Sequence, residues 1–229
     1  MARRVIPSRA FVRARDRPNR GDRGGDTYNP TGDVATADDL RAMAEAAPDA
    51  LVILDHAYVE FADADLTQVA LNLPNVVILR TFSKAWGLAG CRVGYAIGPT
   101  QLIRPLRAAG SPFPVSSLSL DTAMECLMQG TARRDAFVRR IRFERDALHQ
   151  LLSNLNAAPR RSAGNFVFSE LGPRSPEIRS ALLGQGVLVR IIANGTGVPL
   201  GLRIALPGDE AGFTLLCGAL TVALSGART

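Results

Sequence analysis

Two short apolar runs constrain the fold of this chain more than any other feature of its sequence. Each run consists only of Val, Ile and Leu, at residues 51–54 and 76–79, and each ends in polar residues. An apolar run without alternation is typical of a strand that is buried on both faces, as in a parallel sheet covered by helices. With a third strand expected at 92–97, the strand–helix–strand order predicts an α/β fold with a mostly parallel sheet and flanking helices.

The polar residues that follow the two runs predict where a ligand binds. In open α/β sheets, ligands bind beyond the carboxyl ends of the strands. The first run is followed by Asp55 and Tyr58, and the second by Thr81, Ser83 and Lys84. We therefore expect a binding site at this edge of the sheet.

Lys84 is the only lysine among the 27 Lys and Arg residues of the chain. Arginine stays protonated in a protein, whereas lysine can lose its proton and attack a carbonyl carbon. Thr81, Ser83 and Arg92, together with nearby glycines, offer the hydroxyls, the cation and the flexible backbone that bind a phosphate dianion. An amine beside a phosphate-binding loop indicates pyridoxal phosphate as the cofactor. A surface lysine that follows a strand is the alternative interpretation.

The net charge of +6 originates at the start of the chain, where residues 1–23 hold eight arginines and two aspartates. An arginine-rich arm can bind nucleic acid or a membrane surface. This arm has Phe11 as its only aromatic residue and no amphipathic period, and it contains Gly and Pro. We therefore expect residues 1–27 to be a disordered arginine-rich stub, without nucleic-acid binding.

Composition and cysteine spacing exclude several other classes of protein. The chain has 229 residues and is 47% hydrophobic, which is typical of a globular protein. No apolar run approaches the roughly 18–20 residues that a membrane helix needs. Cys91, Cys126 and Cys217 share no short spacing, so neither a metal site nor a disulfide framework is indicated. The sequence therefore predicts a cytoplasmic protein without a membrane segment.

Turn and helix signals divide the remaining chain into two parts. Ordered structure is expected to begin at the turn Asn29-Pro30-Thr31-Gly32, and residues 28–140 are expected to form a partial large domain that binds the cofactor. Short predicted strands at 166–168, 187–190 and 202–206 alternate with helices, which indicates a smaller α+β domain at 141–229. A long helix near 132–155 is expected to link the two domains.

Five motifs stand in a fixed order along the chain: Asn29-Pro30-Thr31-Gly32, Asp55-His56-Ala57-Tyr58, Thr81-Phe82-Ser83-Lys84, Arg92-Val93-Gly94 and Arg203. In this order they resemble the class I/II aminotransferases, which are fold-type I enzymes that use pyridoxal phosphate. Four stretches, 57–61, 79–90, 114–118 and 186–190, resemble the histidinol-phosphate aminotransferase branch of that family. The resemblance covers about residues 28–206. His56 departs from it, because the family usually carries Glu there, and we expect its side chain on the far side of the strand.

The resemblance implies a role for each matched residue. Lys84 would bind the cofactor and move the proton at the substrate carbon, and Asp55 would lie against the pyridine nitrogen. The other roles are contacts to the ring oxygen from Asn29 and Tyr58, to the phosphate from Thr81, Ser83 and Arg92, and to the substrate carboxylate or phosphate from Arg203 and Asn165. The alternatives from the residues alone are a surface or helix-capping acid for Asp55, a core residue for Tyr58 and a structural ion pair for Arg203.

The resemblance also implies an activity and partners. The expected reaction is transamination between an amino donor and a keto-acid acceptor, with histidinol phosphate and 2-oxoglutarate as the pair, in a homodimer. A threonine-phosphate decarboxylase-like enzyme and a non-catalytic fragment are the alternatives. In the family, about a third of the chain precedes the Asn-Pro-Thr-Gly turn. Since residues 1–28 do not resemble that region, we expect a truncated chain with little activity of its own.

Overall fold

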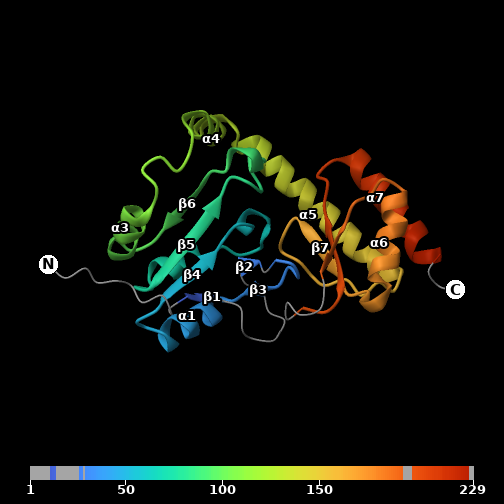
Figure 1. Cartoon of the computed structure of the whole chain (residues 1–229), viewed down its shortest axis with the longest axis horizontal. Coiled ribbons are helices and arrows are strands. Elements are labelled where there is room, and N and C mark those ends of the chain that lie inside the picture. The colour runs from blue at the N-terminus through green and yellow to red at the C-terminus, as the bar shows by residue number, and fades with distance from the viewer. Residues whose placement is uncertain (1–10, 14–25, 28, 193–197, 227–229) are drawn as a thin grey trace. The chain divides into compact units, whose positions relative to one another are not determined.

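The computed structural model describes residues 11–13, 26, 27, 29–192 and 198–226 (Figure 1). Contacts divide the chain into two compact units. The first contains the described residues of Met1–Asp26 together with Ala35–Met128, and the second contains Thr27–Val34 and Gln129–Thr229. The observed division differs from the expected boundary at 140, which lies inside one continuous helix of the second unit.

The first unit contains a four-stranded sheet with the order β1-β4-β5-β6. The strands are β1 (Phe11–Arg13), β4 (Leu51–Asp55), β5 (Val76–Thr81) and β6 (Gly94–Ile97). β5 pairs with β4 in parallel, as the apolar runs predict, and β1 also pairs with β4 in parallel. β6 pairs with β5 in the antiparallel direction. The connection from β5 to β6 contains only the short helix η2 (Ala89–Cys91), whereas the crossover between parallel neighbours usually contains an α-helix.

The strand β1 corrects one expectation. Residues 1–27 are predicted to be disordered, but Phe11, Val12 and Arg13 pair in register with Leu51–Ile53. Phe and Val favour strands, and the edge of β4 offers unpaired backbone groups to them. The segment 1–27 also contains β2 (Asp26–Thr27), which pairs with β3 (Val34–Ala35) beyond it. The remaining residues of the stub, 1–10 and 14–25, lie outside the described residues.

Helices cover the parallel part of this sheet and bury its apolar side chains. The core of Leu40, Val52, Leu54, Val76 and Ile78 is formed with α1 (Ala37–Ala46) and α2 (Thr67–Leu71). α1 begins with the expected capping box, because the Thr36 hydroxyl accepts from Asp39 N and the Asp39 carboxylate accepts from Thr36 N, both at 3.0 Å. The other helices of this unit are η1 (Val59–Phe61), α3 (Thr100–Ala109) and α4 (Ser117–Gln129).

The second unit is an α+β structure with a three-stranded antiparallel sheet of order β7-β9-β8. Its elements are α5 (Thr131–Asn154), β7 (Phe166–Ser169), η3 (Gly172–Arg174), α6 (Ser175–Gly184), β8 (Arg190–Ile192), β9 (Gly201–Ala205) and α7 (Glu210–Gly226). Ile141, Leu148 and Leu152 on α5 are fully buried, as are Phe166 and Phe168 on β7. In the part of the chain that is described, no helix combines the length and apolar character needed to cross a membrane.

The Asn-Pro-Thr-Gly turn belongs to the second unit because it packs on the segment before β7. Gly32 has a φ of +89° and its carbonyl accepts from Ala163 N at 3.1 Å. A Cβ at Gly32 would lie 2.3 Å from Ser162 Oγ, so only glycine fits this contact. The Asp33 carboxylate also pairs with Arg160 at 3.4 Å. These contacts explain why the turn is separated from the sheet residues that sequence reasoning grouped with it.

Candidate active site

The carboxyl ends of β4 and β5 carry the predicted cofactor-binding residues of the first unit. Asp55 ends β4 and is exposed, and Thr81 ends β5. Asp55 pairs with Leu79 in the parallel register, and side chains alternate along a strand, so Asp55 and Thr81 project from the same face. The Asp55 carboxylate accepts from Ala57 N at 3.1 Å, which fixes it at the strand end.

A shallow pocket of about 440 Å³ lies beside these strand ends, and Thr81, Ser83 and Arg92 all line it. The Arg92 Nη1 lies 3.4 Å from Ser83 Oγ and donates to Ala89 O at 3.0 Å. Thr81 Oγ1 accepts from Ser83 N at 3.0 Å. Arg92 has a φ of +56°, an unfavourable left-handed conformation for a residue with a Cβ. Two hydroxyls and a guanidinium in one pocket form a donor set that fits a phosphate group.

Lys84 lies next to this pocket along the chain and contacts Tyr58. The Lys84 Nζ is 5.2 Å from the centre of the Tyr58 ring, which is within cation–π range. Tyr58 follows β4 and is only 6% exposed. The structure thus places in one unit six predicted site residues that come from two strand ends and the loops after them: Asp55, Tyr58, Thr81, Ser83, Lys84 and Arg92.

The three other predicted site residues belong to the second unit. Asn29 is exposed at the start of the turn, and Asn165 is half-buried before β7, where its carbonyl accepts from Leu206 N at 3.0 Å. Arg203 lies on β9 with its guanidinium carbon 4.0 Å from the centre of the Phe166 ring. This stacking gives Arg203 a packed position on the sheet.

Arg190 is a candidate to which sequence reasoning assigned no role. It lies directly opposite Arg203 in the β8–β9 ladder, so both side chains project from one face. Like charges in opposed positions repel each other, and an anion bound between them would offset that repulsion. The predicted strand that ends at residue 190 contained this arginine, but only the register of β8 against β9 places it beside Arg203.

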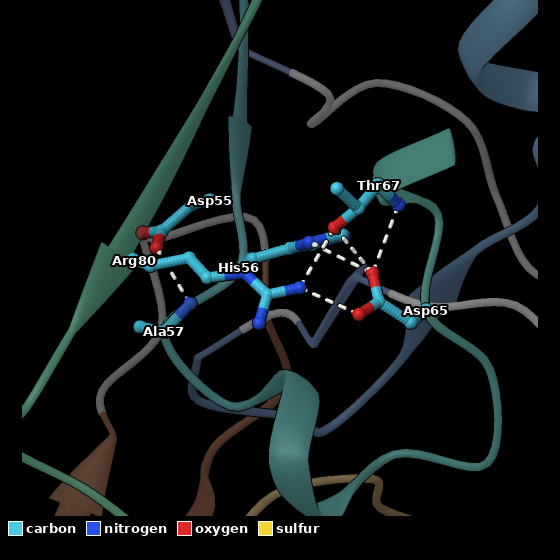
Figure 2. Close-up of polar contacts among 6 residues, drawn as sticks. All are labelled: Asp55, His56, Ala57, Asp65, Thr67 and Arg80. Atoms are coloured by element: carbon cyan, nitrogen blue, oxygen red, sulfur yellow. Dashed lines mark hydrogen bonds and ion pairs between the residues drawn. The ribbon is translucent and has the colours of Figure 1, made fainter. Parts of the chain in front are cut away.

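The structure also shows a polar cluster behind β4 and β5 that sequence reasoning did not find (Figure 2). Arg80 Nη2 donates to Asp65 Oδ2 at 2.5 Å and to Thr67 Oγ1 at 2.7 Å. His56 is fully buried, and its Nδ1 lies 3.7 Å from Asp65 Oδ1. These residues meet only because the loop after η1 returns to the strands.

The surroundings of this cluster shift the pKa values of its members. Burial lowers the pKa of His56 to about 4; Asp65 acts to raise it and Arg80 to lower it further. Burial alone would raise the pKa of Asp65, but the hydrogen bonds from Thr67 and the ion pair with Arg80 hold it below its ordinary value. His56 is therefore neutral, and Asp65 and Arg80 are charged, at neutral pH.

Comparison with known proteins places the chain in a family. Residues 27–220 match the family model "Aminotransferase class I and II". Histidinol-phosphate aminotransferase 1 of Archaeoglobus fulgidus is 37% identical over 80% of this chain and 56% of its own length. An aromatic amino acid aminotransferase of Rhodococcus jostii is 39% identical over 80% of this chain and 50% of its own length.

A solved structure has the same fold. The histidinol-phosphate aminotransferase from Sinorhizobium meliloti, in complex with pyridoxal-5'-phosphate, aligns with a TM-score of 0.76 and 26% identity over 89% of this chain and 57% of that one. The chain thus spans about half the length of the curated relatives that it matches. From its sequence motifs, its fold and these matches, the chain belongs to the class I and II aminotransferases.

Proposed function

We propose that this chain binds pyridoxal phosphate at Lys84 and takes part in transamination. The observation that carries the proposal is the position of the only lysine, which lies against Tyr58 and one residue from a pocket lined by Thr81, Ser83 and Arg92. When bound, the cofactor supplies an electron sink for the substrate carbon. The residues around it decide how it is held and where protons move.

The proposed roles follow from the chemistry of each side chain. Thr81, Ser83 and Arg92 hold the phosphate by charge-assisted hydrogen bonds. The Asp55 carboxylate keeps a proton on the pyridine nitrogen, and Tyr58 contacts the ring oxygen. From the Asn-Pro-Thr-Gly motif, Asn29 is proposed as a further contact to that oxygen.

The Lys84 amine has a second role once the substrate is bound. An amine can accept a proton from the substrate carbon and return it at a neighbouring position, which a permanently charged guanidinium cannot do. The contact with the Tyr58 ring keeps the Lys84 side chain beside the strand ends. We therefore assign proton transfer to Lys84.

For the substrate, we propose a phosphorylated amino compound of the histidinol phosphate type, with a 2-oxo acid such as 2-oxoglutarate as the acceptor. The opposed pair Arg190 and Arg203 supports an anionic group on the substrate, because two guanidinium groups on one face bind a phosphate or carboxylate well. Asn165 lies before the same sheet and is proposed as a further contact to that group. The names of several relatives support this choice of substrate.

We further propose a homodimer in the cytoplasm. All three cysteines are free thiols, which fits a reducing compartment. Leu118, Met124 and Met128 on α4 are 80%, 59% and 75% exposed, and exposed apolar side chains on one helix favour contact with another chain.

A labelling experiment tests the cofactor proposal. Pyridoxal phosphate added to the purified protein should produce a visible absorption band, and borohydride reduction should then leave a stable label. Peptide mapping should place this label on Lys84, the only lysine side chain that can carry it. A label found only on the N-terminal amine would show that Lys84 does not bind the cofactor.

The role of Arg92 leads to a second expected result. Arg92→Ala removes one charged donor from the pocket, a contact worth roughly 1.5–3 kcal/mol. Affinity for pyridoxal phosphate should therefore fall about ten- to a hundredfold. Pyridoxal, which lacks the phosphate, should bind equally to both proteins. If the affinities for both compounds fall together, Arg92 does not act on the phosphate.

A further inference from the structure

Arg80 connects the end of β5 to the start of α2. Its Nη2 donates both to Asp65 Oδ2 at 2.5 Å and to the Thr67 hydroxyl at 2.7 Å. Asp65 Oδ1 in turn accepts from Thr67 N at 2.8 Å and from the Thr67 hydroxyl at 2.5 Å. With His56 beneath them, these residues form what we call the support cluster: His56, Asp65, Thr67 and Arg80 (Figure 2).

Partial burial makes the attraction between Asp65 and Arg80 stronger than that of an ordinary surface ion pair. The His56 side chain has no exposed area and that of Arg80 is 17% exposed, while Asp65 is half exposed. Glu60 and Tyr95 also face the Arg80 guanidinium. Partial removal of water strengthens the attraction between Asp65 and Arg80, whereas exposed pairs are screened. The cluster therefore resists displacement of the two strand ends.

Each strand member of the support cluster is the chain neighbour of a proposed cofactor-binding residue. His56 comes directly after Asp55, the last residue of β4, and Arg80 precedes Thr81 on β5. Adjacent side chains along the chain project from opposite faces here, so His56 and Arg80 leave the sheet on the face opposite to Asp55 and Thr81. Arg80 also lines the pocket, whereas Asp65 does not. His56 N donates to Leu79 O at 2.9 Å and ties the two strands together at this level. Any shift of Arg80 or His56 would move its neighbour.

We propose that Asp65 is a positioning residue, which holds Asp55 and Thr81 in place for the cofactor through its ion pair with Arg80. The proposal rests on the proposed binding of pyridoxal phosphate. It assigns a role to a loop residue, Asp65, that contributes no atom to the binding face. Because Asp65 and Arg80 act through one ion pair, losing either partner should have the same consequence as losing both.

The test compares Asp65→Asn, Arg80→Met and the double variant with the unaltered protein. Asp65→Asn keeps an oxygen for Thr67 N but removes the charge that pairs with Arg80. Asn75→Ala is the matched control, because Asn75 is buried in the same unit and donates to Ala44 O and Ala47 O, away from the strand ends. Affinity for pyridoxal phosphate is measured at neutral pH through the fluorescence of Trp86, the only tryptophan, at temperatures where every variant is folded.

Each single variant should bind pyridoxal phosphate about tenfold more weakly. This is the lower end of the loss in affinity at metal sites when a residue that orients a metal ligand is removed. The double variant should lose no more than the single variants. Asn75→Ala should have a lower Tm but an affinity within about twofold of the unaltered protein, since general destabilisation does not move Asp55 or Thr81 in the folded state.

Hydrogen exchange gives a second reading without any cofactor. Ala57 N donates to the Asp55 carboxylate and Ser83 N donates to the Thr81 hydroxyl, so these two amides report directly on the positioned side chains. Both amides should exchange faster in Asp65→Asn and not in Asn75→Ala. The inference is overturned if affinity and exchange are unchanged in Asp65→Asn. It is also overturned if the double variant loses affinity by the product of the two single-variant factors. An unaltered protein that fails to bind the cofactor, with the exchange result as expected, would overturn the proposed function alone.

Discussion

Replacing Lys84 by Arg or by Ala should abolish transamination by any assembly in which this chain is active. Both variants lose the amine that we propose binds the cofactor and moves the proton at the substrate carbon, and proton transfer alone typically contributes about 10²–10⁴-fold to a rate. Lys84→Arg keeps the positive charge near Tyr58 but cannot give up its proton. Turnover in both variants should therefore fall at least a hundredfold, measured as glutamate-dependent formation of the product amine.

The pair of variants separates chemistry from charge. If Lys84 served only as a cation against the Tyr58 ring, Lys84→Arg would retain most of the activity and Lys84→Ala would lose it. The far-ultraviolet circular dichroism of both variants should match that of the unaltered protein, since Lys84 is only partly buried. Equal activity in all three proteins would show that Lys84 has no catalytic role.

Acid should destabilise the first unit through His56. The pKa of this imidazole is about 4 in the folded chain, and its ordinary value is 6.5. Between pH 4 and pH 6.5 the imidazole is therefore protonated in the unfolded chain and neutral in the folded chain. Stability is then lost as the pH falls from about 6.5 to 4, by about 3 kcal/mol in total and about 2 kcal/mol by pH 5. His56→Gln, which cannot titrate, should lack this loss in urea unfolding experiments.

Two features of the chain separate the contribution of His56 from those of other titratable groups. The chain has only two histidines, and His149 lies on α5 in the second unit, so His149→Gln is a matched control that should retain the acid sensitivity. The pKa of Asp65 is held below 3.8, so its contribution is lost only at lower pH. Measurements from pH 7 to pH 5 therefore isolate His56. If His56→Gln and the unaltered protein lose stability equally over this range, the imidazole is not the cause.

The sequence by itself determined the two central strands of the first unit and proposed the residues of the candidate site. Continuous Val, Ile and Leu runs exclude an amphipathic element, so β4 and β5 and their parallel pairing could be predicted. The capping box of Thr36 and Asp39 is a local contact and was therefore also predictable. Lys84 was proposed as the cofactor lysine from chemistry, because no other residue in the chain carries an amine side chain that can lose its proton.

Tertiary structure decided the features that depend on residues far apart in the chain. β1 pairs with β4 because an unpaired strand edge accepts a suitable segment, and local composition, which predicts disorder there, carries no information about that edge. The Asn-Pro-Thr-Gly turn joins the second unit through Gly32 and Ser162, a contact across 130 positions. Likewise, Arg190 lies beside Arg203 only through strand register.

The support cluster shows the same distinction within one site. Alternation along β4 predicts that His56 lies behind the sheet, but alternation cannot say what it meets there. The loop after η1 brings Asp65 to Arg80 beside the imidazole, and burial is the largest cause that lowers the pKa of His56. Residue type and spacing thus determined which groups could react, whereas desolvation and pairing, which require the folded chain, decided their charge and their position.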